Sequence, residues 1–145
     1  AARNPLLKAA LGAAVRIWFE ASRSLQDLCR GRSIYYLHVL QPTLHDTGSK
    51  PLDPTEITDV PKNLDYINGV QALYPRMKQA GEELRALGVN FYDASMAFAD
   101  VKAPVYYDAC HFKGQGNEIV AARIAEAFLR TLPAADSSAS KNAPR

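Results

Sequence analysis

Apolar residues recur every three or four positions over residues 7–29, which predicts an amphipathic helix ending near Gly31. One small polar residue, Ser22, interrupts this stripe, and Trp18 is expected in the core. The apolar members of the stripe are Leu7, Leu11, Ala14, Trp18, Leu25 and Cys29.

The next segment, Ser33–Leu40, is almost continuously apolar and aromatic, and Gln41 and Pro42 follow it. Such a run is typical of a strand that is covered on both faces, as in parallel sheets. His38 lies within it, and we expect a hydrogen-bonded core or strand-end histidine there rather than a ligand.

Thr43–Asn63 is polar and rich in proline, which predicts a long surface loop. His45 and Asp46 lie in it and are expected to be a solvated pair. A substrate-facing role is the alternative, because the loop follows the carboxyl end of a strand, where such sheets bind ligands.

A second helical pattern runs from Leu64 to Leu87, and Pro75 interrupts it. Two shorter helices, or one helix kinked at the proline, both fit. Gly88 is expected to close this element as a C-cap, and Val89–Asp93 reads as a short strand.

The last predicted helix is Gln115–Leu132, which a connecting loop over residues 94–105 precedes. Its expected apolar stripe consists of Val120, Ile124, Ala127, Phe128 and Leu132. Residues 133–145 are rich in alanine and serine without periodicity, which predicts a disordered tail.

The element order predicts one α/β domain with parallel strands over residues 1–132. A length of 145 residues, with 48% hydrophobic and 22% charged residues, suits a single globular domain. Two strands make a poor sheet, so we expect part of this sheet to lie outside the chain.

Charge and apolar runs narrow the choice of partners. The net charge is only +2 and the basic residues are scattered, which argues against nucleic acid. The longest apolar run, Ala9–Val15, is much shorter than the roughly 20 residues of a transmembrane helix. The compartment and the oligomeric state stay open, and a secreted or periplasmic full-length protein is compatible with the sequence.

Cys29 and Cys110 are the two cysteines, which are too few for a disulfide scaffold and lack metal-ligand spacing. We expect two free thiols, and a single bridge stays an alternative for an exported protein. Cys110 is expected to pack rather than to act as a nucleophile.

The strongest candidate chemistry lies at Asp108 and His111, in the stretch YYDACHFKGQGN. On a tight turn, a carboxylate three residues before a histidine can accept its Nδ1 hydrogen and leave Nε2 free as a base. The turn also follows the last predicted strand, where α/β proteins place reactive groups. The spacing alone, however, favours a surface or capping turn.

This stretch resembles the C-terminal motif of the SGNH, or GDSL-type, hydrolases. The matching positions are Asp108, His111, Gly116, Asn117 and Ala121, and Gln41-Pro42 resembles the end of the family's penultimate strand. The chain departs from the motif at residues 113–115, Lys-Gly-Gln, where family members usually have Thr or Ser and then Pro. Helix capping is expected to be weaker as a result, although Gly114 can serve as a permissive N-cap.

The resemblance implies a flavodoxin-like three-layer α/β/α fold and ester hydrolysis by a Ser-His-Asp triad. His111 would be the general base and then the general acid, and Asp108 would orient it. The implied substrate is a small-molecule or carbohydrate ester, and no metal or organic cofactor is implied.

The family's Gly-Asp-Ser and Gly-x-Asn-Asp motifs are not found in the sequence, and neither is a Gly-x-Ser-x-Gly elbow. We therefore expect the chain to be the C-terminal portion of such an enzyme and to be inactive alone, because its base has no nucleophile to activate.

Two alternatives remain. One is a non-catalytic carbohydrate-binding or interaction module on the same fold, and the other is an unrelated α/β domain in which the motif is a coincidence. Four tyrosines offer rings for stacking on sugars, but we expect them to pack instead. They are Tyr35, Tyr36, Tyr106 and Tyr107.

Overall fold

The computed structural model describes residues 5–60 and 62–132, which form a mixed α/β fold that is mostly helical. Its elements are α1 (Pro5–Arg30), β1 (His38–Leu40), α2 (Pro54–Asp59), α3 (Leu64–Ala86), β2 (Phe91–Asp93) and α4 (Gly114–Thr131). The predicted tail, 133–145, lies outside the described residues. Within the described ranges, no helix is both long enough and apolar enough to cross a membrane.

β1 and β2 pair in parallel, with His38 opposite Phe91 and Leu40 opposite Asp93. The predicted α/β class with parallel strands is thus confirmed. The predicted strand Ser33–Leu40 is wrong over residues 33–37, because β2 begins only at Phe91 and leaves that segment without a paired strand. The second predicted strand is likewise shortened to its last three residues.

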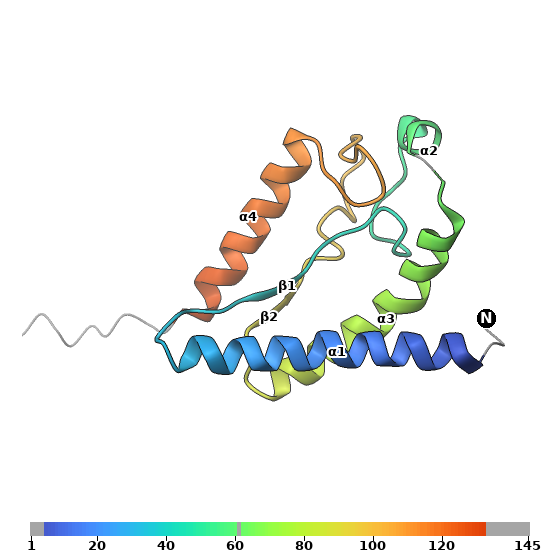
Figure 1. Cartoon of the computed structure of the whole chain (residues 1–145). Helices are drawn as coiled ribbons and strands as arrows, with labels where there is room; N and C mark the ends of the chain where they lie inside the picture. Colours follow the sequence, from blue (N-terminus) through green and yellow to red (C-terminus); the bar gives the residue numbers. More distant parts are fainter. Residues whose placement is uncertain (1–4, 61, 133–145) are drawn as a thin grey trace, which may run out of the picture.

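α1 and α3 cover one side of the strands, and Figure 1 shows α4 on the other side. The core between the strands and the first two of these helices has four buried residues, Leu40, Leu84, Val89 and Phe91, with Trp18, Phe19, Tyr36, Tyr74 and Met77 packed around them. α3 approaches β2 closely at Gly81, where a methyl group would overlap the ring of Phe91.

The polar break in the stripe of α1 has a structural reason. Ser22 is buried, and its Oγ lies 2.6 Å from Nδ1 of His38. Burial lowers the pKa of His38, which favours the neutral imidazole. The expectation of a hydrogen-bonded strand histidine is confirmed. The predicted stripe is wrong at Leu7, Ala14 and Leu25, which are exposed.

α3 is a single helix across Pro75, so the alternative of two shorter helices is wrong. Gly88 has a left-handed backbone conformation, with a φ of 82°. The N–H of Val89 donates to the carbonyl of Leu84, and the N–H of Gly88 donates to that of Arg85. This is a Schellman ending, which confirms the expected glycine cap.

A second core lies between α4 and the loops that follow the strands. Its buried residues are Leu44, Val60, Ala97, Phe98, Val105, Tyr106 and Val120. Ile124 packs against them, which confirms this part of the predicted stripe of α4. Phe128 and Leu132 are instead more than a third exposed, and the ring of Phe128 meets that of Tyr35 edge-on.

The surface loop predicted over Thr43–Asn63 is wrong in two respects. It contains α2, and several of its polar residues are buried: Thr43, Asp46, Ser49, Lys50 and Glu56. Asp53 caps α2 by accepting the N–H of Thr55, while Glu56 accepts the N–H of Asp53. The polar side chains of this segment therefore bond to protein groups instead of water.

The start of α4 also differs from the expectation. Lys113, not Gly114, is the N-cap residue, and its side chain makes no capping hydrogen bond. Asn117 in the first turn instead turns its Nδ2 back to the carbonyl of Phe112, at 3.2 Å.

Candidate functional site

Asp108 and His111 lie at the tip of a short hairpin formed by residues 105–113. Tyr106 and Phe112 form an antiparallel bridge, and the N–H of Tyr107 donates to the carbonyl of His111 at 2.9 Å. At the base of the hairpin, the N–H of Lys113 donates to the carbonyl of Val105 at 2.7 Å.

The tip of the hairpin is held by the segment that follows β1. The carbonyl of Ala109 accepts the N–H of Leu44 at 3.0 Å and the hydroxyl of Thr43 at 2.8 Å. Because these two residues come shortly after the end of β1, the tip lies near the carboxyl end of that strand. The sheet thus fixes the place of the two candidate residues.

α4 fixes the hairpin from its other end. A Cβ on Gly116 would lie 2.9 Å from the carbonyl oxygen of Val105 and 2.9 Å from Cβ of Phe112, so glycine permits this close approach. The Gly-Asn pair of the motif therefore has a local structural role: Gly116 lets the helix approach, and Asn117 bonds the carbonyl of Phe112.

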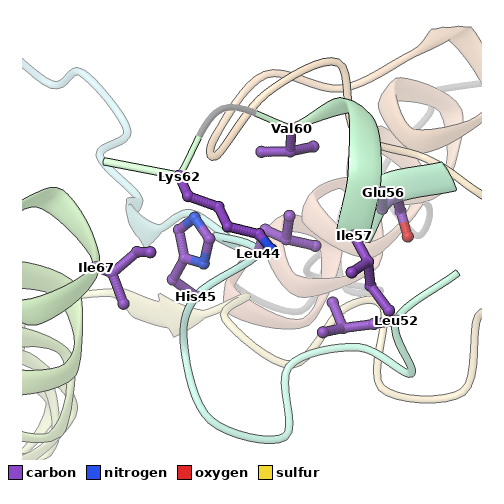
Figure 2. A pocket seen from close by; sticks show the side chains of 8 residues that line it. All are labelled: Leu44, His45, Leu52, Glu56, Ile57, Val60, Lys62 and Ile67. Carbon is purple, nitrogen blue, oxygen red and sulfur yellow. The ribbon is translucent and has the colours of Figure 1, made fainter. Parts of the chain in front are cut away.

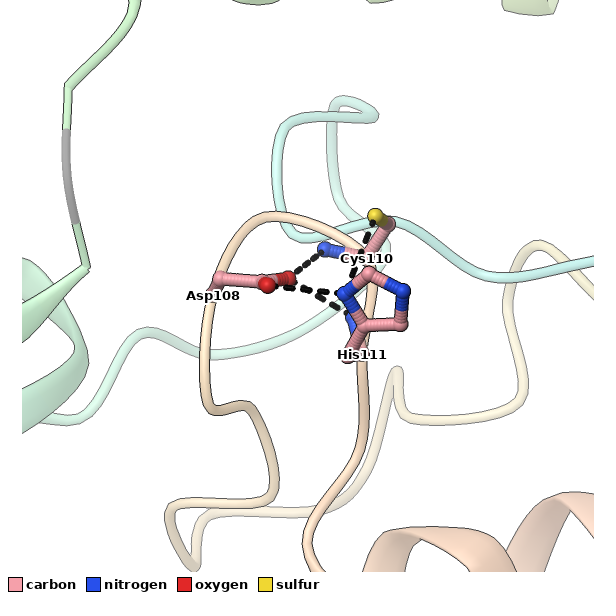
Figure 3. Close-up of side chains that lie close together, drawn as sticks. All are labelled: Asp108, Cys110 and His111. Carbon is pink, nitrogen blue, oxygen red and sulfur yellow. Dashed lines mark hydrogen bonds and ion pairs between the residues drawn. The ribbon is translucent and has the colours of Figure 1, made fainter.

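The carboxylate of Asp108 and the imidazole of His111 are joined by a hydrogen bond. Nδ1 of His111 lies 2.7 Å from Oδ2 of Asp108 (Figure 3). The other oxygen, Oδ1, accepts the backbone N–H groups of Cys110 and of His111, both at 2.9 Å. The His111 side chain is 75% exposed, and Figure 3 shows its second ring nitrogen directed away from the carboxylate.

These contacts set the charge of Asp108. Its pKa lies well below the usual range, first because of the backbone N–H of Cys110, and then because of the side chain and the backbone N–H of His111. The carboxylate is therefore ionised at neutral pH. An ionised carboxylate at Nδ1 favours the tautomer whose hydrogen is on Nδ1, which leaves the lone pair of Nε2 free.

Cys110, which was expected to pack, lies beside the imidazole of His111. Its Sγ lies 3.8 Å from Nδ1 of His111, so the neighbouring side chains converge on the turn. Tyr66 also faces this thiol: its pKa is raised chiefly by burial, and Cys110 and Asp108 add to the increase. Both cysteines are free thiols, as expected, and the alternative of a bridge between Cys29 and Cys110 is not found.

The expected solvated pair, His45 and Asp46, is wrong. Asp46 is buried and lies 2.6 Å from Nζ of Lys78 on α3, an ion pair that ties the loop to this helix. His45 is partly buried, which lowers its pKa, and its buried Nε2 has no hydrogen-bond partner among the described residues.

His45 lines an apolar pocket of about 290 Å³ between α2 and the start of α3 (Figure 2). The lining residues are Leu44, His45, Leu52, Glu56, Ile57, Val60, Lys62 and Ile67. The backbone N–H of Leu44 also donates to the carbonyl of Ala109 in the hairpin. Leu44 therefore both lines this pocket and holds the hairpin.

Sequence reasoning missed a buried pair that supports the hairpin. Oε1 of Glu56 accepts the N–H groups of Val105 and Tyr106, at 2.8 and 3.0 Å, and Oε2 lies 2.7 Å from Nζ of Lys50. The available signal was Asp53-Pro54-Thr55-Glu56, a capping box with proline at the first helical position.

The tyrosines divide into two groups. Tyr106 is buried in the core beside α4, and Tyr36 packs against the separate core beside the strands, as expected. Tyr107 is 66% exposed beside Asp108, so the expectation of packing is wrong for this ring.

No protein-family model matches the chain, and no curated protein or solved structure matches it either.

Proposed function

We propose that this chain supplies the base and the orienting carboxylate of an SGNH-type ester hydrolase. The observation that carries the proposal is the 2.7 Å hydrogen bond between Oδ2 of Asp108 and Nδ1 of His111. In this proposal, the described α/β fold is one part of a larger flavodoxin-like three-layer domain.

The chemistry follows from the tautomer. With its hydrogen on Nδ1, His111 takes the proton of a serine hydroxyl through Nε2 and later gives it to the leaving alcohol. Asp108 stays ionised and stabilises the imidazolium that forms between these steps. The exposure of His111 leaves room for a nucleophile and a substrate at Nε2.

The position of the turn supports the same role. Thr43 and Leu44 follow β1 and hold the hairpin tip, which puts the imidazole beyond the carboxyl end of a parallel strand. In open α/β sheets, ligands bind outside this end of the strands. The substrate is a carboxylic ester of a small molecule or a carbohydrate, and the chemistry of the triad uses no cofactor.

The serine and the oxyanion donors are assigned to a part of the domain outside this chain. Among the described residues, each strand pairs along one edge only. α1 also leaves large apolar side chains exposed, with Ile17 at 69% and Leu28 at 52%. Open edges and exposed apolar side chains are what further strands and helices of such a domain would cover.

The test is hydrolysis of p-nitrophenyl acetate by the longest natural form of the protein. His111→Ala should lower kcat by about 10⁴-fold or more, and Asp108→Asn by about 10⁴-fold, because the wrong tautomer forms. Asp100→Asn is the matched control, an exposed carboxylate outside the hairpin, and should leave kcat unchanged. Undiminished turnover in His111→Ala would contradict the proposal.

The 145-residue chain gives a second readout. Without a triad serine it should not hydrolyse this ester at a triad rate, since removing the serine costs about as much as removing the whole triad. Turnover by the short chain that disappears in His111→Ala would mean that the nucleophile lies within it.

Non-catalytic carbohydrate binding is the second candidate, and the exposed ring of Tyr107 beside Asp108 favours it. If this alternative is correct, the longest natural form binds a sugar, and the binding shifts the NMR signals of Tyr107. Tyr107→Ala should then abolish sugar binding, and no ester should be hydrolysed.

A further inference from the structure

We propose that Asp108, Cys110 and His111 form a binding site for a divalent cation of the zinc class. The turn brings together a carboxylate, a thiol and an imidazole, and one ligand atom from each lies within 4.8 Å of the other two (Figure 3). These are the three side-chain types that bind Zn²⁺ in proteins.

The spacing of the ligand atoms fits a small tetrahedral ion. Zinc bonds of about 2.0–2.3 Å place neighbouring ligand atoms about 3.2–3.8 Å apart. Sγ of Cys110 already lies 3.8 Å from Nδ1 of His111. Oδ2 of Asp108 lies 2.7 Å from the same nitrogen, so it has to retreat by only a fraction of an ångström when an ion replaces the shared hydrogen.

The backbone prepares the carboxylate for this role. Oδ1 of Asp108 accepts two backbone N–H groups, from Cys110 and His111, which fix the side chain and leave Oδ2 available. Hydrogen bonds of this kind orient metal ligands and strengthen binding. A fourth position stays open to water or to a ligand from outside the turn, because the imidazole is largely exposed.

The charges also suit a soft dication. An ordinary aspartate is ionised at neutral pH, and the thiol of Cys110 loses its proton on binding: Zn²⁺ and Cys–SH give Zn–S–Cys and a released H⁺. The two anionic ligands offset the double charge. A thiolate and an imidazole select against Mg²⁺ and Ca²⁺, which prefer sites made of oxygen ligands alone.

Metal binding and base chemistry exclude each other at His111. When Nδ1 binds an ion, the hydrogen of the neutral imidazole is on Nε2, so this atom cannot accept a proton. Bound zinc would therefore switch the hydrolase off, a consequence that rests on the proposed function. The metal site itself does not rest on it.

The test uses the reduced chain, freed of metal, and no ester. Calorimetry with ZnCl₂ should show one ion per chain and the release of a proton, and CoCl₂ should produce a thiolate-to-cobalt absorption band. Cys110→Ala should remove the band and weaken zinc binding by more than about 100-fold, the upper range for losing only an outer-shell partner. Asp108→Asn should weaken binding in the same direction.

Cys29→Ala is the matched control, because it removes the other free thiol, on α1. It should keep the band and the affinity for zinc. Circular dichroism checks that each variant folds, and the nearly isosteric Cys110→Ser gives the same test with the least disturbance of the turn.

The proposal is overturned by a chain without the thiolate band, by a band that survives in both Cys110 variants, or by a band lost in Cys29→Ala. A negative result leaves the hydrolase proposal untouched, since no hydrolysis is measured. Inactivity toward esters likewise leaves a metal site with these properties in place.

Discussion

Nζ of Lys50 lies 2.7 Å from Oε2 of Glu56, and both side chains are shielded from solvent, at 0% and 1% exposure. Oε1 of Glu56 accepts the N–H groups of Val105 and Tyr106, with which the hairpin of residues 105–113 begins. A buried ion pair in the loop after β1 thus supports the hairpin that carries the candidate site.

Glu56→Gln should lower the free energy of unfolding by about 3–5 kcal/mol, because it leaves the ammonium of Lys50 buried without its counter-charge. Urea unfolding followed by circular dichroism measures the loss. Glu82→Gln is the matched control: Glu82 pairs with Arg85 at 2.7 Å on the surface of α3, and losing such a pair costs less than about 1 kcal/mol.

The double variant Glu56→Gln/Lys50→Met separates the ion pair from general damage to the loop. It removes both charges, so it should lose clearly less stability than the sum of the two single variants. Equal losses in Glu56→Gln and Glu82→Gln would contradict a buried, supporting pair.

The long helices could be predicted from the sequence, because each carries many turns of apolar periodicity. The strands could not be bounded in the same way. Ser33–Leu40 is apolar throughout, but pairing depends on a neighbour, and β2 offers one only from Phe91 onward. The composition of one segment does not predict where its partner strand begins.

The candidate site shows the same difference between local contacts, which can be predicted, and contacts between distant segments, which cannot. Asp108 and His111 are three residues apart, so the turn that joins them is a local feature, and their hydrogen bond was predictable. Asp46 pairs with Lys78 on α3, and Glu56 accepts the N–H groups of Val105 and Tyr106, so both carboxylates bond to segments far from their own in the sequence. Without knowledge of those partners, the polar composition of the loop predicts solvated side chains. Cys110 was predicted to pack because adjacent side chains usually diverge, whereas the Asx-type turn here brings its sulfur toward His111.

Gly116→Ala should destabilise the protein by about 1–3 kcal/mol, because the added methyl group would lie 2.9 Å from Val105 O and from Cβ of Phe112. Gly114→Ala, two residues earlier, is the matched control: nothing lies within 4 Å of its added Cβ. Alanine also favours helix, so this control should be neutral or stabilising by up to about 1 kcal/mol.

Thermal unfolding of the two glycine variants compares them directly. Gly116→Ala should also shift the amide NMR signals of the hairpin of residues 105–113, because the hairpin must move away from α4. The same loss of stability in both variants would contradict the close approach at Gly116 as the cause of its destabilisation.

Asp108 should stay ionised to lower pH than an ordinary aspartate, whose pKa is about 3.9. Its folded-state pKa is depressed, so the stabilisation from its hydrogen bonds is present in full above the unfolded pKa and is lost as pH falls through the folded value. The carboxyl ¹³C shift of Asp108 followed against pH measures this. His111→Ala should raise the pKa only part of the way, because the N–H of Cys110, the largest cause of the depression, and the N–H of residue 111 both remain. A return to the ordinary value in His111→Ala would mean that the imidazole alone holds the carboxylate in its charged form, and that the backbone of the turn does not prepare it.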